Sequence, residues 1–162
     1  MPVIPKRAKE ELDGSKLYYE FKERCIYCDI IRQESQSGTR LVTETDRFIV
    51  VEPYAARFPF ETWIIPKRHS SHFEESDAPQ LQNLAWVLRT TLRKLDKTLE
   101  RPPYNFVIHM APVQEPAMSH YHWHIEILPI VETKSKSYSI KETYFNAVSP
   151  EQAAEQLRSI DS

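Results

Sequence analysis

Glycine is almost absent from this sequence of 162 residues, in which Gly14 and Gly38 are the only two. Phosphate-binding loops of the Rossmann and P-loop types need several closely spaced glycines, because the backbone must approach the phosphates without interference from Cβ atoms. The composition therefore excludes both types of loop. Any phosphate that the protein binds must be held by other means.

The sequence also lacks an excess of charge of one sign and any apolar run long enough to span a membrane. Its 21 Lys and Arg against 23 Asp and Glu give a net charge of −2, so no basic surface points to nucleic acid. The first seven residues, Met-Pro-Val-Ile-Pro-Lys-Arg, have no apolar core of the kind found in signal peptides. We expect a cytoplasmic protein that binds neither nucleic acid nor membrane.

Cysteine is as scarce as glycine, but the two cysteines, Cys25 and Cys28, form a C-x-x-C pair. In a cytosolic chain this spacing indicates metal ligation or a redox pair rather than a structural disulfide. No parallel-sheet pattern of the thioredoxin type surrounds the pair. Tetrahedral zinc needs four nitrogen or sulfur donors, and His69, His72 and the histidines at 120–124 can supply the other two. We favour zinc, with free thiols or a redox pair as the alternatives.

One stretch, 119–128, concentrates the remaining chemistry. Three histidines and a glutamate alternate with apolar residues there: His120, His122, His124 and Glu126 between Tyr121, Trp123, Ile125 and Ile127. Because successive side chains of a β-strand point to opposite faces, a strand would gather the imidazoles and the carboxylate on one face. The other face would be an apolar strip that anchors the strand in the core. We interpret this stretch as the active strand.

The rest of the chain predicts an α+β fold with an antiparallel sheet of about five strands flanked by helices. Strands are expected at 40–44, 48–52, 61–65 and 104–110, besides the histidine strand. Helices are expected at 7–23 (broken near Asp13 and Gly14), at 77–99 with a leucine stripe, and after Ser149. The polar stretch 132–143 is expected to be mobile. Residues 1–24 form a helical lead-in and 25–162 a single domain in this interpretation.

Several individual side chains have a structural and a functional interpretation. We place Trp63, Trp86 and Trp123 in the core and His72 at the surface. His109 is either a pocket residue or a buried polar group. Arg57 can bind a phosphate through two parallel hydrogen bonds, or it can be a structural arginine stacked on its aromatic loop.

The motifs together resemble the histidine-triad superfamily, whose pattern is H-φ-H-φ-[H/Q]-φ-φ. The resemblance rests on Tyr121-His122-x-His124, on Cys25-Ile-Tyr-Cys28, on Pro53-Tyr54 through Phe60-Glu61, and on Ile65-Pro66-Lys67-x-His69. It is strongest for the C-terminal domain of galactose-1-phosphate uridylyltransferase-like proteins, a group that includes ADP-glucose phosphorylases. Those proteins consist of two histidine-triad domains in tandem, and the resemblance covers nearly the whole of this chain.

The resemblance allows two registers on the histidine strand. In the first, His120, His122 and His124 form the triad. In the second, His122, His124 and Glu126 do, with Tyr121 just before them and Ser119 placed to contact phosphate. We prefer the second register, because family members commonly carry the Tyr and the Ser at these places. It implies that His122 is a zinc ligand with Cys25, Cys28 and His69, with iron as the less favoured metal. It also implies that His124 is the nucleophile, supported by Glu126, with Ser119, His109 and Arg57 binding the substrate.

The function that the resemblance implies is nucleotidyl transfer between a nucleotide sugar and a sugar phosphate. An imidazole nitrogen of His124 would attack the α-phosphorus, and the nucleotidyl-histidine would then pass its nucleotidyl group to the acceptor. A neutral imidazole suits this step, since its ordinary pKa is about 6.5. The alternatives are a non-catalytic zinc-stabilised half that partners an absent catalytic half, a zinc-dependent binding module, and a nucleotide hydrolase. A homodimer, or pairing with a second histidine-triad-like domain, is expected in each case.

Overall fold

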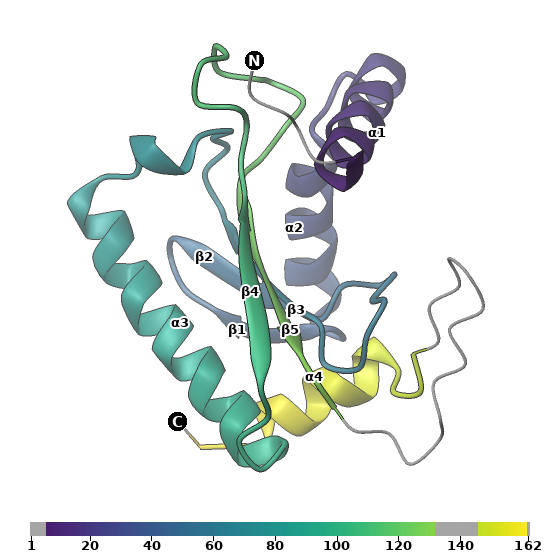
Figure 1. The fold of residues 1–162 in the computed structure, drawn as a ribbon, viewed down its shortest axis with the longest axis vertical. Helices are drawn as coiled ribbons and strands as arrows, with labels where there is room; N and C mark the ends of the chain where they lie inside the picture. Colours follow the sequence, from purple (N-terminus) through teal and green to yellow (C-terminus); the bar gives the residue numbers. More distant parts are fainter. Residues whose placement is uncertain (1–5, 132–145, 162) are drawn as a thin grey trace.

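The computed structural model describes residues 6–131 and 146–161, which form one sheet with helices on both faces (Figure 1). The helices are α1 (Lys6–Lys22), α2 (Ile26–Ser37), α3 (Ala78–Thr98) and α4 (Pro150–Arg158), with a short 3-10 helix, η1 (Phe73–Glu75). The strands are β1 (Leu41–Glu44), β2 (Phe48–Val51), β3 (Thr62–Pro66), β4 (Tyr104–His109) and β5 (His124–Pro129). The polar stretch 132–143 that we expected to be mobile lies outside the described residues.

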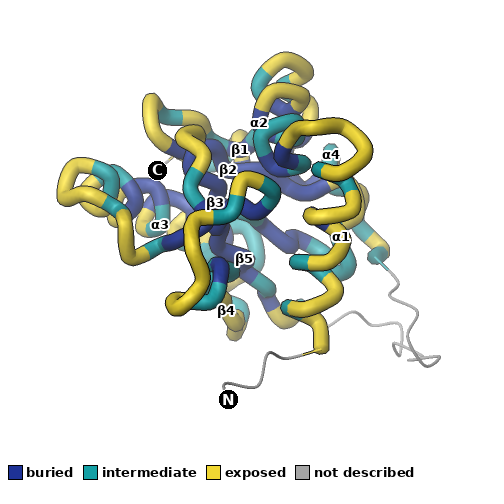
Figure 2. Tube along the Cα trace, turned by 90° about the horizontal axis from the view of Figure 1, so that it is seen from above, coloured by how far each residue is buried: buried dark blue, intermediate teal, exposed yellow. Residues whose placement is uncertain are grey.

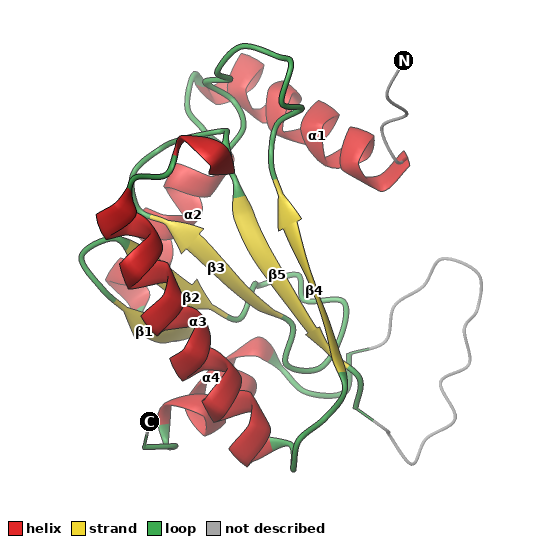
Figure 3. Cartoon of the chain, turned by 60° about the vertical axis from the view of Figure 1, so that its left-hand side comes forward, coloured by secondary structure: helices red, strands yellow, loops and turns green. Residues whose placement is uncertain are grey.

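The five strands form one antiparallel sheet in the order β1-β2-β3-β5-β4. The β5 strand lies between β3 and β4, where His124 pairs with His109 and Glu126 pairs with both Trp63 and Val107. Strand β4 is at the edge of the sheet, beside β5 (Figure 3). The α+β prediction with about five antiparallel strands is confirmed.

Alternation along the strands divides the core into two layers, one on each face of the sheet. On the face covered by α3 and α4, β2, β3 and β5 contribute Phe48, Val50, Ile64, Ile125 and Ile127, and Trp123 joins them from the segment just before β5. On the face covered by α2, the same sheet contributes Ile49, Val51 and Ile65, which pack with Tyr27 and Tyr121. Figure 2 shows these buried segments beneath helices whose outer surfaces are exposed. His124 and Glu126 alternate with Ile125 and Ile127, so they face the α2 side.

Helix ends follow their sequence signals. Ser149 and Gln152 form the predicted capping box at the start of α4, and the Asp77 side chain accepts a hydrogen bond from the Gln80 backbone at the start of α3. Gly38 ends α2 in the left-handed conformation (φ 65°), which glycine adopts without a steric cost. None of the helices in the described part of the chain combines the length and the apolar character that crossing a lipid bilayer requires.

Four expectations about local structure were wrong. Helix α1 runs unbroken through Asp13 and Gly14. Trp86 is half exposed (50%) on the outer side of α3, whereas His72 is buried at 4% exposure, with its Nδ1 2.8 Å from the Ser71 hydroxyl. The histidine stretch is a strand only from His124 onwards, because Ser119–Trp123 forms a turn and an extended segment.

The late start of β5 has a consequence for the histidines. Strict alternation from 120 would place Tyr121 on the same face as Trp123, yet Tyr121 packs into the opposite layer with Tyr27. Tyr121 faces the opposite layer because the chain turns before it enters the sheet. His122 and His124 therefore belong to two different groups of residues and do not share one polar face.

Candidate functional site

Two clusters of polar side chains meet where β5 begins. One contains the C-x-x-C pair, His69 and His122. The other contains His124 with His109 and is covered by Glu11 of α1. His124 is the first residue of β5 and His122 lies two residues before it, so the two clusters are adjacent in space.

The first cluster has the donor set of a tetrahedral zinc site. One ligand atom each from Cys25, Cys28, His69 and His122 lies within 4.8 Å of all the others. The Cys28 sulfur is 3.4 Å from Nδ1 of His69 and 3.6 Å from Nδ1 of His122. Two thiolates and two imidazoles suit zinc in its usual four-coordinate geometry. These are the four residues that the sequence predicted as ligands, brought together from α2 and its cap, the segment after β3, and the segment before β5.

Backbone carbonyls orient both imidazoles. Nε2 of His122 lies 2.8 Å from the Pro66 carbonyl, and Nε2 of His69 lies 3.2 Å from the Met118 carbonyl. A carbonyl can only accept, so each Nε2 carries the proton and each Nδ1 presents its lone pair toward the thiols. Metal-binding histidines are commonly fixed in this way by the hydrogen bond of the second nitrogen. The residues present therefore fit the metal.

The pKa values of the two thiols are shifted in opposite directions, so Cys25 ionises more readily than Cys28. Its contacts with Cys28, and then with His122 and His69, lower the pKa of Cys25 in spite of its burial. The same Cys25–Cys28 contact raises the pKa of Cys28. A cation bound here would favour ionisation of both thiols.

The second cluster is centred on His124, whose side chain is fully buried. Its ring packs between His109, with centroids 4.9 Å apart and nearly parallel planes, and the rings of Tyr27 and Trp63 at 4.6 and 5.2 Å. Nδ1 lies 3.1 Å from the His122 carbonyl, so it donates there and Nε2 carries the lone pair. Burial lowers the pKa of His124 to about 4, which keeps the imidazole neutral. A fixed tautomer and a free Nε2 lone pair are what a nucleophilic imidazole needs.

Helix α1 covers Nε2 of His124 with Glu11. Oε1 of Glu11 is 3.5 Å from Nε2 of His124, which has no hydrogen-bond partner among the described residues. The same carboxylate accepts hydrogen bonds from the hydroxyls of Tyr27 (2.7 Å) and Tyr121 (2.8 Å), and its Oε2 is 2.7 Å from Nδ1 of His109. A substrate can therefore reach Nε2 only if the Glu11 side chain moves.

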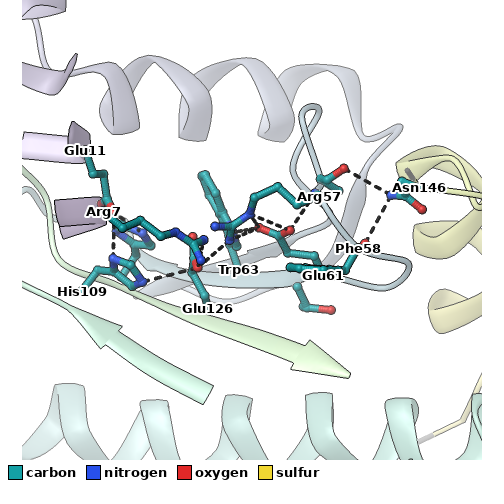
Figure 4. A network of polar contacts seen from close by, with 12 residues as sticks. Arg7, Glu11, Arg57, Phe58, Glu61, Trp63, His109, Glu126 and Asn146 are labelled. Atoms are coloured by element: carbon teal, nitrogen blue, oxygen red, sulfur yellow. Dashed lines mark hydrogen bonds and ion pairs between the residues drawn. The ribbon is translucent and has the colours of Figure 1, made fainter. Parts of the chain in front are cut away.

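Glu126 is part of a network of ion pairs rather than a free carboxylate (Figure 4). Arg57 reaches both Glu126 and Glu61, each at 2.7 Å, and Nε2 of His109 is 3.3 Å from Glu126. Burial disfavours charge on His109, but its hydrogen bonds to Glu11 and Glu126 outweigh this and raise its pKa to about 9. Glu126 is also buried, yet His109 and Arg57 hold its pKa below the usual range.

Glu11, His109 and His124 also form a second set with metal-ligand spacing, since their ligand atoms lie within 4.8 Å of one another. One carboxylate with two imidazoles suits a harder metal than the thiolate set does. Iron, the less favoured metal of the sequence prediction, would fit this trio better than the cysteines.

The structure places the other predicted site residues as follows. Arg57 lies in the His124 cluster, but its guanidinium is engaged by carboxylates. His109 lies in the same cluster, between Glu11 and Glu126. Ser119 is exposed and lines a separate cavity of about 210 Å³ beside His69. His120 lies outside both clusters, with its ring 6.4 Å from that of Tyr19.

Sequence reasoning missed Glu11, Tyr27, Tyr121 and Glu61 as members of the site. Glu11 lies in a stretch rich in Lys and Glu, where one carboxylate cannot be distinguished from its neighbours. Tyr27 lies between the two cysteines, and this position was the one feature of the sequence that could have placed it near the site. Glu61 was noted as part of a motif, but its pairing with Arg57 depends on the loop between β2 and β3.

Residues 10–162 match the family model described as "Galactose-1-phosphate uridyl transferase, C-terminal domain". The chain is 36% identical over 162 residues to ADP-glucose phosphorylase from Arabidopsis thaliana, covering 99% of this chain and 45% of that protein. It is 35% identical over 165 residues to galactose-1-phosphate uridylyltransferase from Thermotoga maritima, covering 97% and 51%. The chain thus spans about half the length of the curated relatives it matches.

Solved structures agree with this match. The structure of an Arabidopsis thaliana ADP-glucose phosphorylase with bound ADP-glucose superposes with a TM-score of 0.86 at 36% identity, covering all of this chain and 52% of that one. A histidine triad nucleotide-binding protein from Sulfolobus tokodaii superposes with a TM-score of 0.61 at 20% identity, covering 83% and 90%. At that identity the likeness concerns the fold alone, and it confirms the predicted histidine-triad-like architecture.

Proposed function

This chain belongs to the galactose-1-phosphate uridyl transferase family, as its C-terminal domain, and from that premise we propose that it takes part in hexose-1-phosphate nucleotidyl transfer. The reaction passes a nucleoside monophosphate from a nucleotide sugar to a sugar phosphate through a nucleotidyl-histidine. The observation that carries the proposal is the pairing of a Cys2His2 set with an oriented, neutral His124 two residues beyond the ligand His122. Residues 1–24 would act as a helical lead-in to a histidine-triad-like domain at 25–162, in the cytoplasm.

Zinc is the metal that we propose for Cys25, Cys28, His69 and His122. Its role would be structural: it would hold α2, the segment after β3 and the segment before β5 together. In doing so it would fix the backbone carbonyl of His122, which orients His124. No step of the chemistry passes through the metal.

His124 is the proposed nucleophile and Glu126 its supporting carboxylate. The contact between them is indirect, because His109 stacks on His124 and bridges to Glu126. Arg57 and His109 neutralise Glu126, which lessens the repulsion that a bare carboxylate would exert on an incoming phosphate. Attack on phosphorus requires the Glu11 side chain to leave Nε2.

The position of Glu11 favours a second candidate, in which this chain is the non-catalytic half of the enzyme. A fully buried His124 facing a carboxylate is not open to substrate in this conformation. In that case the zinc site and the pairing surface would be the contributions of this chain. The chemistry would take place in a second histidine-triad-like domain.

Intact mass after incubation with a panel of UDP- and ADP-sugars separates the two candidates. The first predicts an acid-labile adduct of one nucleoside monophosphate that is lost in His124→Ala and retained in His120→Ala. Absence of an adduct from the wild-type chain, with turnover restored only when a second domain is supplied, selects the non-catalytic half. An adduct that persists in His124→Ala would reject His124 as the nucleophile.

Pairing with a second copy or with a second histidine-triad-like domain completes the proposal. Strand β4 is an edge strand whose Tyr104, Phe106 and Val107 are 38%, 53% and 45% exposed. Unpaired backbone groups and exposed apolar side chains on one edge are features of a surface that pairs.

A further inference from the structure

Three hydrogen-bond donors converge on the Glu11 carboxylate from outside its own helix. The hydroxyls of Tyr27 and Tyr121 donate to Oε1 at 2.7 and 2.8 Å, and Nδ1 of His109 lies 2.7 Å from Oε2. Tyr27 and Tyr121 are 4% and 2% exposed, so their positions are set by the core layer under α2. The donors belong to the folded domain, whereas their acceptor belongs to α1.

Helix α1 itself is bound loosely to this domain. Of its 17 residues only Ser15 is buried. Leu12 packs against the layer under α2, but the other described contacts of α1 with the sheet and with α2 are mainly polar: Glu11 in the cluster, Arg7 to Glu126 at 3.4 Å, and Tyr18 to Asp29 at 2.9 Å. Local opening requires little free energy where few apolar contacts hold a segment.

Both ring nitrogens of His109 face carboxylates, Glu11 on one side and Glu126 on the other, so both act as donors. His109 therefore carries a positive charge in this arrangement. Together with Arg7 and Arg57, it faces Glu11, Glu61 and Glu126. Three cations are thus balanced by three carboxylates, and removal of Glu11 alone leaves one positive charge uncompensated.

A cavity of about 290 Å³ opens beside Glu11 and Tyr27, and its walls include Arg7, Arg57, Glu61 and Glu126. Its volume is just below the usual range for small-molecule sites, which suits a small anion. A small oxyanion could therefore enter beside Glu11 without passing through the core.

From these contacts we infer that Tyr27, Tyr121 and His109 form an oxyanion-binding site that Glu11 fills as a built-in ligand, and that an external phosphate or phosphate monoester binds there when Glu11 swings out. Leaving three buried donors unsatisfied costs more than exchanging one acceptor for another, which favours exchange over a vacant site. An oxyanion at this place lies next to the Nε2 lone pair of His124. The inference deepens the proposed function, on which it rests for the choice of phosphate.

The test is binding of inorganic phosphate to the zinc-loaded protein, measured by calorimetry and by the rise in melting temperature. Glu11→Ala should bind phosphate at least tenfold more tightly than the wild type, and acetate should also stabilise it. Glu20→Ala, which removes an exposed carboxylate of α1 that does not line this cavity, should behave as the wild type does. Adding Tyr27→Phe or Tyr121→Phe to Glu11→Ala should reverse the gain.

Equal phosphate affinity in Glu11→Ala and Glu20→Ala, with both folded and zinc-loaded, would overturn the inference. So would a second metal ion in the wild type that Glu11→Ala loses, because Glu11 would then be a ligand rather than a stand-in for an anion. If Glu11→Ala does not fold, Glu11→Ser provides a small polar side chain that cannot reach the three donors, and unchanged phosphate affinity there is equally decisive. Phosphate binding by Glu11→Ala without any nucleotidyl adduct would reject the catalytic proposal and leave this one standing.

Discussion

Nη2 of Arg57 lies 2.7 Å from Oε2 of Glu126, across 69 positions of sequence. The same guanidinium lies 2.7 Å from Glu61, so one arginine bridges a loop residue and the histidine strand. The sequence predicts different roles for the two residues: phosphate binding or a structural role for Arg57, and support of the triad for Glu126. In the folded protein each compensates the charge of the other.

Arg57→Ala should destabilise the protein by about 2–4 kcal/mol, because it leaves the carboxylates of Glu61 and Glu126 buried beside each other without their shared cation. Denaturant unfolding of the metal-loaded protein measures this. Arg24→Ala is the matched control, since its pair with Asp29 is largely exposed and should contribute less than ~1 kcal/mol. Equal losses in the two variants would show that the bridge adds nothing.

Metal content should be about one zinc per chain, and chelation should lower the melting temperature, because the binding free energy of a structural metal is also folding free energy. His122→Ala should lose the metal, and His120→Ala should retain it. Elemental analysis of protein purified without chelators measures both. Loss of zinc from His120→Ala alone would restore the first register of the histidine strand.

The alkaline stability profile should depend on His109. Its pKa is raised to about 9 in the folded chain, against about 6.5 when unfolded. The stabilisation is therefore complete below pH 6.5 and is lost as the pH rises through 9, with a total of about 1–3 kcal/mol. His109→Asn should flatten the unfolding free energy over this window, while His120→Asn should leave it unchanged. An unaltered slope in His109→Asn would contradict the charged bridge between Glu11 and Glu126.

Glu52 should destabilise the protein increasingly as the pH rises. It is fully buried, accepts one hydrogen bond from Thr62 at 2.6 Å, and its Oε2 has no partner among the described residues. Burial raises its pKa to about 8, so the folded state keeps a proton that the unfolded state releases above about 4.5. Stability should fall between these values.

Glu52→Gln should remove that slope and raise the unfolding free energy at pH 7.5 by about 1–3 kcal/mol. Chemical denaturation at pH 5 and pH 7.5 compares the two forms. Glu74→Gln, on the exposed η1 helix, serves as the control. A variant that is equally stabilised at both pH values would point to packing rather than to ionisation.

The β4 edge should mediate self-association at micromolar concentration. Phe106→Asp places a charge in the proposed interface and should shift the protein to monomer in light scattering. Val113→Asp changes a more exposed apolar residue (68%, against 53% for Phe106) outside the strands and should leave the dimer intact. A wild-type monomer at these concentrations would refute the pairing of two copies.

The sequence by itself determined the sheet and most helix boundaries, and the family resemblance predicted the four residues that the fold brings together as a possible metal site. Local signals decide these features: Ser149 and Gln152 cap their helix through contacts three residues apart, and strand alternation sets the faces of Ile125 and Ile127. The C-x-x-C pair and the histidine spacing limit which donors can form a tetrahedron. Such features need no knowledge of distant partners.

Only the tertiary structure decided what surrounds His124. The alternation that predicted one polar face fails before His124, because the chain enters the sheet from a turn, so Tyr121 joins the opposite layer. Glu11 is brought to His124 by the packing of α1 across the site, a contact 113 positions apart that no local pattern encodes. Burial and long-range charge pairing set the ionisation of His109 and His124, and these depend on the assembled fold rather than on neighbours in sequence.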